Sequence, residues 1–158
     1  MKKMHLFAGV IALLLCLSSC HMQKSYRNDV PIKEITEDVI EDADTEFKRS
    51  EDAYLGAYIP DRSHIREQEI YFASDGNNLD EFGIFYSDHP KELAAELNRY
   101  LASTLEENES FYNSYIPEEV PKLRDAEVRT FGNYVAYAIL SGKDRKSFFD
   151  TVEDELEP

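Results

Sequence analysis

The sequence AEVRTFGNYVAYAIL, residues 126–140, carries the strongest folding signal in the chain. Two apolar runs flank Gly132-Asn133, and glycine at the first central position of a two-residue turn favours a type II′ β-hairpin. Because residues 134–140 are apolar on both faces, we expect this segment to be an interior strand of a sheet. The hairpin register places one set of side chains on a common face: Val128, Thr130, Val135, Tyr137 and Ile139.

A second hairpin is predicted earlier in the chain. Residues 69–74 are rich in β-branched and aromatic side chains, and residues 75–78 (Asp-Gly-Asn-Asn) are typical of a turn. The strand pattern resumes at residues 79–87. Residues 44–68 have a weaker pattern, and there we expect either a second short helix or a loop folded over the core.

Apolar residues at helical spacing predict three main helices. The first begins at Pro31 and continues to about residue 43, and the second runs from Pro90 to Tyr115, where Pro117 ends it. Asp144 is expected to cap the third helix. One side of that helix carries the apolar residues Phe148, Phe149, Val152 and Leu156.

The order of these elements predicts the fold class. Helix, hairpin, long helix, hairpin and helix favour an α+β domain, in which an antiparallel sheet of about four strands is formed by two hairpins. Three main helices are expected to pack against this sheet. We expect residues 31–158 to form a single domain of this kind.

The N-terminus has the features of a secretory signal peptide. Lys2 and Lys3 precede an uncharged apolar run at residues 6–17. These 12 residues span about 18 Å as a helix, which is short of the roughly 30 Å hydrocarbon core of a bilayer. The run ends in Leu17-Ser18-Ser19-Cys20, which resembles the lipobox of bacterial lipoproteins.

The lipobox resemblance implies a processing site and a location. In lipoproteins the signal peptidase recognises the residues that correspond to Leu17, Ser18 and Ser19, cleavage falls before the cysteine, and the cysteine sulfur carries the lipid. We therefore expect residues 1–19 to be a signal peptide, residues 20–30 to be the lipidated Cys20 and a flexible tether, and the protein to be anchored on the outer face of the cytoplasmic membrane. Two acyl chains suffice for stable membrane attachment.

Composition excludes several classes of function. The chain has 32 acidic and 17 basic residues, a formal net charge of −15, and loss of the signal peptide removes Lys2 and Lys3 but no acid. Nucleic acid is not expected as a partner, because its phosphates would repel this charge. Cys16 leaves with the signal peptide and Cys20 is acylated, so no thiol remains for a disulfide, a metal site or a nucleophile.

No motif in the mature sequence predicts a catalytic, cofactor or metal site. His21, His64 and His89 have no partner at metal-ligand spacing, and no Gly-x-Ser-x-Gly sequence positions a nucleophile. Residues 75–80 begin like a calcium loop but have Leu79 where a ligand is needed. The adjacent acids at 80–81 and 118–119 point in different directions along a chain, and 32 acids make such pairs common by chance.

Three short segments carry a family resemblance. Residues 79–85 (LDEFGIF), 115–119 (YIPEE) and 132–135 (GNYV) together resemble one group of small Gram-positive lipoproteins, over roughly residues 31–156. The domain that this group shares is of unknown function. The resemblance implies an extracytoplasmic lipoprotein and no activity, ligand or catalytic residue.

Two functions remain as hypotheses. The first is a non-enzymatic, lipid-anchored binding module whose partner is a cell-envelope protein or a wall component. The second is a small hydrolase of wall or peptide substrates, which would need converging polar groups around His64 or His89. Tyr112 and Tyr115 are candidates for stacking on sugars or peptide, although packing in the core or at its rim is the commoner use of tyrosine.

Overall fold

A computed structural model of the chain describes residues 24–50, 55, 59 and 61–158. The predicted signal peptide (residues 1–19), Cys20 and His21 lie outside these residues. Among the helices in the described ranges, none combines the length and the apolar character that crossing a membrane would need.

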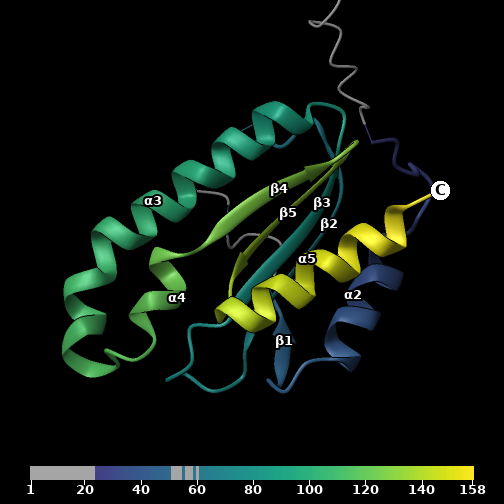
Figure 1. Cartoon of the computed structure of the whole chain (residues 1–158). Helices are drawn as coiled ribbons and strands as arrows, with labels where there is room; N and C mark the ends of the chain where they lie inside the picture. The colour runs from purple at the N-terminus through teal and green to yellow at the C-terminus, as the bar shows by residue number, and fades with distance from the viewer. Residues whose placement is uncertain (1–23, 51–54, 56–58, 60) are drawn as a thin grey trace, which may run out of the picture.

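The centre of the fold is one antiparallel sheet of five strands in the order β1-β2-β3-β5-β4 (Figure 1). The strands are β1 (Phe47–Arg49), β2 (Ile65–Ala73), β3 (Glu81–Ser87), β4 (Glu127–Phe131) and β5 (Tyr134–Ile139). Both predicted hairpins are confirmed, as β2–β3 and β4–β5. The predicted interior strand is also confirmed, because β5 lies between β3 and β4 and all of its residues are buried.

The turn of the β4–β5 hairpin has the predicted geometry. Phe131 pairs with Tyr134, which leaves a two-residue loop, and Gly132 has a φ of 60° while no non-glycine residue in the described part of the chain has a positive φ. A positive φ at the first central position alone is the type II′ pattern. The register also pairs Val128 with Tyr137, so the predicted common face is confirmed.

The fifth strand, β1, corrects the expectation of about four strands. Phe47–Arg49 pairs with the end of β2, where the sequence predicted a short helix or a loop, and β2 itself begins at Ile65 rather than at residue 69. A three-residue edge strand is too short for a periodic pattern, and its pairing with β2 is a tertiary choice. In the rest of this segment, Leu55 and Ile59 are buried as expected for a loop over the core, and its other residues from 51 to 60 lie outside the described ranges.

The described residues contain four helices: α2 (Ile32–Glu41), α3 (Pro90–Tyr115), α4 (Val120–Arg124) and α5 (Gly142–Leu156). The three main helices are confirmed, and α4 is an additional helix of five residues. The N-cap of α5 is Ser141, whose side chain accepts a hydrogen bond from the backbone N–H of Asp144, so the expected cap at Asp144 is wrong by three residues. The Asp144 carboxylate instead accepts a hydrogen bond from the Ser141 hydroxyl.

The helices form two layers on opposite faces of the sheet (Figure 1). α2 and α5 cover one face, where α5 contributes Phe148, Phe149, Val152 and Leu156 as predicted, and α3 with α4 covers the other. Each face therefore has its own hydrophobic core, and β3 and β5 supply side chains to both. This arrangement explains why β5 is apolar on both faces.

Residues 24–30 pack on the domain, which corrects the prediction of a flexible tether for this part of the chain. Val30 is buried, with its N–H donating to Tyr134 Oη (3.1 Å) and its carbonyl accepting from the same hydroxyl (2.7 Å). The Arg27 N–H donates to the carbonyl of Leu156 (2.8 Å), and the Tyr26 ring meets Phe131 edge-on at 5.6 Å. The segment lacks periodicity because it docks as irregular backbone.

Candidate functional site

The domain has two distinct ends. At the first, which we call the tether end, residues 24–30 meet the C-terminus of α5 and the β4–β5 turn, and the Ser87 N–H donates to the Asn133 carbonyl. At the opposite, distal end lie the β2–β3 turn, the start of α5 and the far end of α3 (Figure 1). The polar clusters described next lie at the distal end.

A buried ion cluster joins three segments at the distal end. Asp80 is 4% exposed, and its Oδ2 accepts from Thr45 Oγ1 (2.7 Å) and Asn78 Nδ2 (3.2 Å). Its Oδ1 lies 2.7 Å from Lys122 Nζ, which is also 2.8 Å from Glu119 Oε2. Glu119 Oε2 also accepts a hydrogen bond from the backbone N–H of Leu79, at the end of the β2–β3 turn (2.9 Å). Asp80 therefore connects the α2–β1 loop to the start of β3, and Lys122 of α4 connects Asp80 to Glu119.

The charge state of Lys122 follows from these contacts. Burial alone would lower its pKa, but hydrogen bonds and Coulombic attraction from Asp80 and Glu119 outweigh burial and raise the pKa above its ordinary value. Lys122 is therefore a stable cation between two carboxylates. Such a group organises structure and does not serve as a general base at neutral pH.

Glu81 belongs to a separate network on the α3 face of the sheet. Its Oε1 accepts from both Tyr100 Oη (2.8 Å) and Tyr137 Oη (2.5 Å). Burial raises the pKa of Glu81, and the two tyrosine hydrogen bonds oppose that shift without cancelling it. Asp80 and Glu81 thus point into different networks, as expected for adjacent acids.

Gly83 gives the Tyr137 ring its place in this network. The two residues are directly paired across β3 and β5, and a Cβ on Gly83 would lie closer than 3.0 Å to Tyr137 Cε1. Because Gly83 has no side chain, the Tyr137 ring can lie over the backbone of β3, and its hydroxyl reaches Glu81 on the same face of the sheet. Glycine inside a strand is typical of a bulge or of a close approach by a neighbour, and here β3 and β5 pair in regular register, so the close approach of Tyr137 applies.

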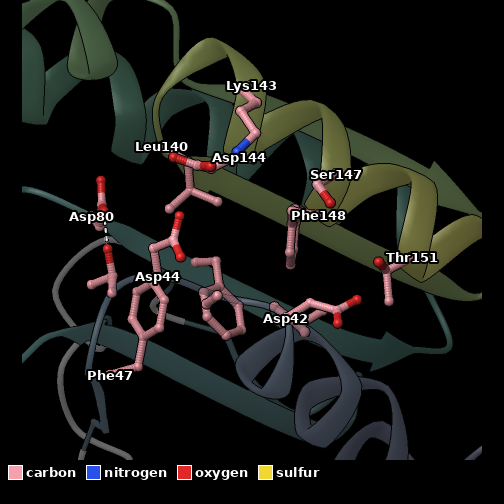
Figure 2. Close-up of a pocket in the computed structure, with 14 residues that line it drawn as sticks. Asp42, Asp44, Phe47, Asp80, Leu140, Lys143, Asp144, Ser147, Phe148 and Thr151 are labelled. Carbon is pink, nitrogen blue, oxygen red and sulfur yellow. Dashed lines mark hydrogen bonds between the residues drawn. The ribbon is translucent and has the colours of Figure 1, made fainter.

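A cavity of about 100 Å³ opens at the distal end between α2, α5 and the sheet (Figure 2). Aromatic rings form part of its wall, where Phe82 contacts Phe47 (ring centroids 5.1 Å apart) and Phe148 (5.2 Å). Figure 2 shows that Asp44 and Asp144 enter the hollow from opposite sides. The polar residues around it are Asp42, Asp44, Thr45, Asp80, Lys143, Asp144, Ser147 and Thr151.

The size and lining of the cavity define what it can accept. At about 100 Å³ the cavity is smaller than a 150 Å³ cavity that holds benzene, so it suits a short alkyl group rather than a whole cofactor. Apart from Asp80, whose carboxylate is paired with Lys122, the lining has three carboxylates (Asp42, Asp44 and Asp144) and one lysine, which favours a ligand that carries a cation or several hydrogen-bond donors next to its apolar part. Sequence reasoning missed this site because it is assembled from residues more than 100 positions apart.

His64 and His89 come together at the tether end. Their rings stack with centroids 5.6 Å apart, because the Asp88 N–H pairs with the His64 carbonyl beside the end of β3. His64 is buried and its Nε2 has no hydrogen-bond partner in the described part of the chain, while His89 Nδ1 lies 3.1 Å from Glu92. Within the described ranges neither ring hydrogen-bonds to a serine or threonine hydroxyl.

Two further expectations concern metals and aromatic residues. Within residues 24–50 and 61–158, no group of three or more His, Cys, Asp or Glu side chains is arranged to hold a metal ion. Tyr112 is half-buried against the α3-face core, in line with the commoner use of tyrosine. Tyr115 is 71% exposed and Phe111 is 57% exposed.

Comparison with known proteins gives no relative: no protein-family model, no curated protein and no solved structure matches the chain.

Proposed function

We propose that the protein is a lipid-anchored, extracytoplasmic binding module of the cell envelope, held on the outer face of the cytoplasmic membrane by lipid on Cys20. Its distal end binds a cell-envelope protein or a wall component. The observation that carries this proposal is the docking of residues 24–30 at the end of the domain opposite to the cavity.

The docked segment makes the membrane attachment short. Cys20 is four residues from Lys24, and successive Cα atoms are 3.8 Å apart, so the lipidated residue lies within about 15 Å of the domain. A lipid on Cys20 would therefore turn the tether end toward the bilayer. α3 starts near the tether end, and its 26 residues carry the chain about 39 Å along the helix axis.

The cavity supports binding as the activity of the distal end. It combines an apolar interior with an acidic rim, and its ligand is a small apolar group next to a cation or hydrogen-bond donors. A lysine, an arginine or an amino sugar of an envelope partner has this chemistry. No hydrogen-bonded nucleophile and base in the described residues favours the hydrolase alternative.

Lipid attachment is tested by metabolic labelling in a bacterium with lipoprotein-processing enzymes. The full chain should incorporate labelled palmitate and stay with membranes through a high-salt wash. Cys20→Ala should lose the label, whereas the matched control Cys16→Ala should keep it, because Cys16 lies in the signal peptide. A wild-type chain without label would refute the lipid anchor.

The orientation is tested with single cysteines, since the lipidated chain has no other thiol after processing. Ser147→Cys places a thiol at the cavity rim and Asn28→Cys places one at the tether end. A thiol-to-amine crosslinker applied to intact cells should capture a discrete partner from Ser147→Cys and little from Asn28→Cys. The opposite pattern would show that the distal end is not the binding end.

A further inference from the structure

The second half of α3 has no fully buried residue in the described structure, although Leu105 and Tyr112 pack with partial burial against the α3-face core. All four fully buried residues of this helix lie in its first half: Leu93, Leu97, Tyr100 and Leu101. Figure 1 shows the C-terminal part of α3, together with α4, projecting past the edge of the sheet. This part carries the two large apolar side chains that are exposed in the described residues, Phe111 and Tyr115.

The exposed rings form a continuous patch with Tyr112. The centroids of Phe111 and Tyr115 are 4.6 Å apart, and those of Phe111 and Tyr112 are 5.6 Å apart. We call these three residues the aromatic patch. Because Phe111 and Tyr115 are one helical turn apart, their rings share one face of α3 and present it to solvent.

Negative charge surrounds the aromatic patch. Glu107 precedes Phe111 by four positions, so it lies on the same helix face, and it is exposed, as is Glu118 just beyond the helix. The last turn of α3 contains no basic residue, so no side chain of that turn compensates the negative end of the helix dipole. These groups attract a cation, and aromatic faces bind cations through their π-electrons.

Elsewhere in the domain, two phenylalanine rings make cation–π contacts with basic side chains. Lys48 Nζ lies 4.7 Å from the Phe72 centroid, and the Arg129 guanidinium lies 4.2 Å from that of Phe149. Over Phe111 and Tyr115, no lysine or arginine of the described residues takes the equivalent position. Two basic residues that follow the patch in sequence are held in ion pairs: Lys122 pairs with Asp80 (2.7 Å) and Glu119 (2.8 Å), and Arg124 pairs with Glu109 (2.5 Å).

We propose that the aromatic patch, with Glu107 and Glu118, is a docking surface for a basic segment of a partner protein, with a lysine or arginine side chain over the rings. Charge complementarity carries this choice, because a chain of net charge −15 repels anionic lipid and anionic wall polymers. A neutral sugar would stack on the rings but would leave the two carboxylates and the helix end without a counter-charge. The surface is separate from the cavity and does not require the lipid anchor.

The test is a binding titration of the full lipoprotein, purified in a mild uncharged detergent, with a fluorescent peptide of alternating arginine and glycine. At about 0.1 M salt, surface charges act over roughly 10 Å. The double variant Phe111→Leu/Tyr115→Leu keeps apolar surface but removes both rings, and its affinity should fall about five- to tenfold. Since both side chains are exposed, the melting temperature should not change, and this is measured alongside.

A charge-matched pair of variants separates local docking from general attraction. Glu107→Gln should lower the affinity for the peptide about twofold. The control Glu41→Gln removes one exposed carboxylate on the other face of the sheet and should leave the affinity unchanged. The proposal is overturned if the peptide does not bind, if the double variant binds as the wild type does, or if Glu41→Gln weakens binding as much as Glu107→Gln. Patch-dependent binding of a chitin oligosaccharide or an anionic vesicle in place of the peptide would also overturn it.

Discussion

The tether end and the distal end of this domain are built from different kinds of contact. At the tether end three contacts involve backbone groups: Val30 with the Tyr134 hydroxyl, Arg27 with Leu156, and Ser87 with Asn133; the ion pairs there, Lys24 with Glu153 (2.6 Å) and Glu157 (2.5 Å), are partly exposed to solvent. At the distal end the main contacts join charged side chains, above all Asp80, Glu119 and Lys122. Backbone contacts hold a segment in place whatever its side chains are, whereas side-chain contacts create local chemistry.

The two ends also differ in what their burial costs. Backbone groups at the tether end are neutral and paired, so they gain modest free energy from each hydrogen bond. Buried ions at the distal end lose hydration, and their mutual attraction does little more than offset that loss. The comparison teaches that the charged cluster at the distal end fixes the relative position of three segments while its ion pairing adds little net stability.

The largest effect is expected from Gly83→Ala, on the distal side. The new Cβ would overlap the Tyr137 ring and displace its hydroxyl from Glu81, so the free energy of unfolding should fall by about 3 kcal/mol. Gly76→Ala is the control, because a Cβ there meets no atom within 4 Å and the change should be within about 0.5 kcal/mol. Equal denaturant midpoints for the two variants would show that the ring is not confined as described.

The next effect is expected from Tyr134→Phe, which removes the hydroxyl that serves both backbone groups of Val30. A buried polar group left without a hydrogen bond costs about 1–3 kcal/mol. Because water can reach the two Val30 groups as the segment loosens, we expect the free energy of unfolding to fall by roughly 2 kcal/mol in total. Hydrogen exchange at the Arg27 amide should accelerate together with that at Val30. Tyr86→Phe, whose hydroxyl accepts only from Asn133 Nδ2 at 3.3 Å among the described hydrogen bonds, should leave both amides protected. If the exchange rates of both amides in Tyr134→Phe equal those of the wild type, the docking of residues 24–30 does not depend on this hydroxyl.

The smallest effect is expected from Glu81→Gln and depends on pH. The folded chain raises the pKa of Glu81 above its ordinary value of 4.5, so the folded state binds the proton more tightly than the unfolded state. The stability of the wild type should therefore decline as pH rises from about 4.5 through the raised pKa. A glutamine at this position can accept hydrogen bonds from the Tyr100 and Tyr137 hydroxyls but does not ionise. The stability of the variant should therefore not decline over this pH range.

Thermal unfolding at several pH values measures this difference. The melting temperatures of wild type and Glu81→Gln should be closest below pH 4.5 and should diverge in favour of the variant as pH rises. Glu106→Gln, at an exposed position of α3, should follow the wild type across the range. Parallel curves for Glu81→Gln and wild type would mean that Glu81 ionises in the folded state as readily as in the unfolded state.

Local sequence patterns were sufficient for most of the fold and for little of the candidate site. The β4–β5 hairpin followed from Gly132-Asn133 and an apolar strand, because turn geometry is set by neighbouring residues. The strand β1 did not follow, because three residues carry no periodic signal. The cluster around Lys122 was equally hidden, since Asp80 and Lys122 are 42 positions apart and each reads as an ordinary surface charge.

Periodicity, turn chemistry and the N-terminal pattern were properties of adjacent residues, so the chain alone determined the α+β class, the two hairpins, the three main helices and the expectation of a lipid on Cys20. Only tertiary structure decided that residues 24–30 belong to the domain, that His64 meets His89, and that a cavity opens opposite the tether end. The physical reason is that these features depend on which distant segments lie side by side. That choice minimises the free energy of the whole chain and is not encoded in any short window of it.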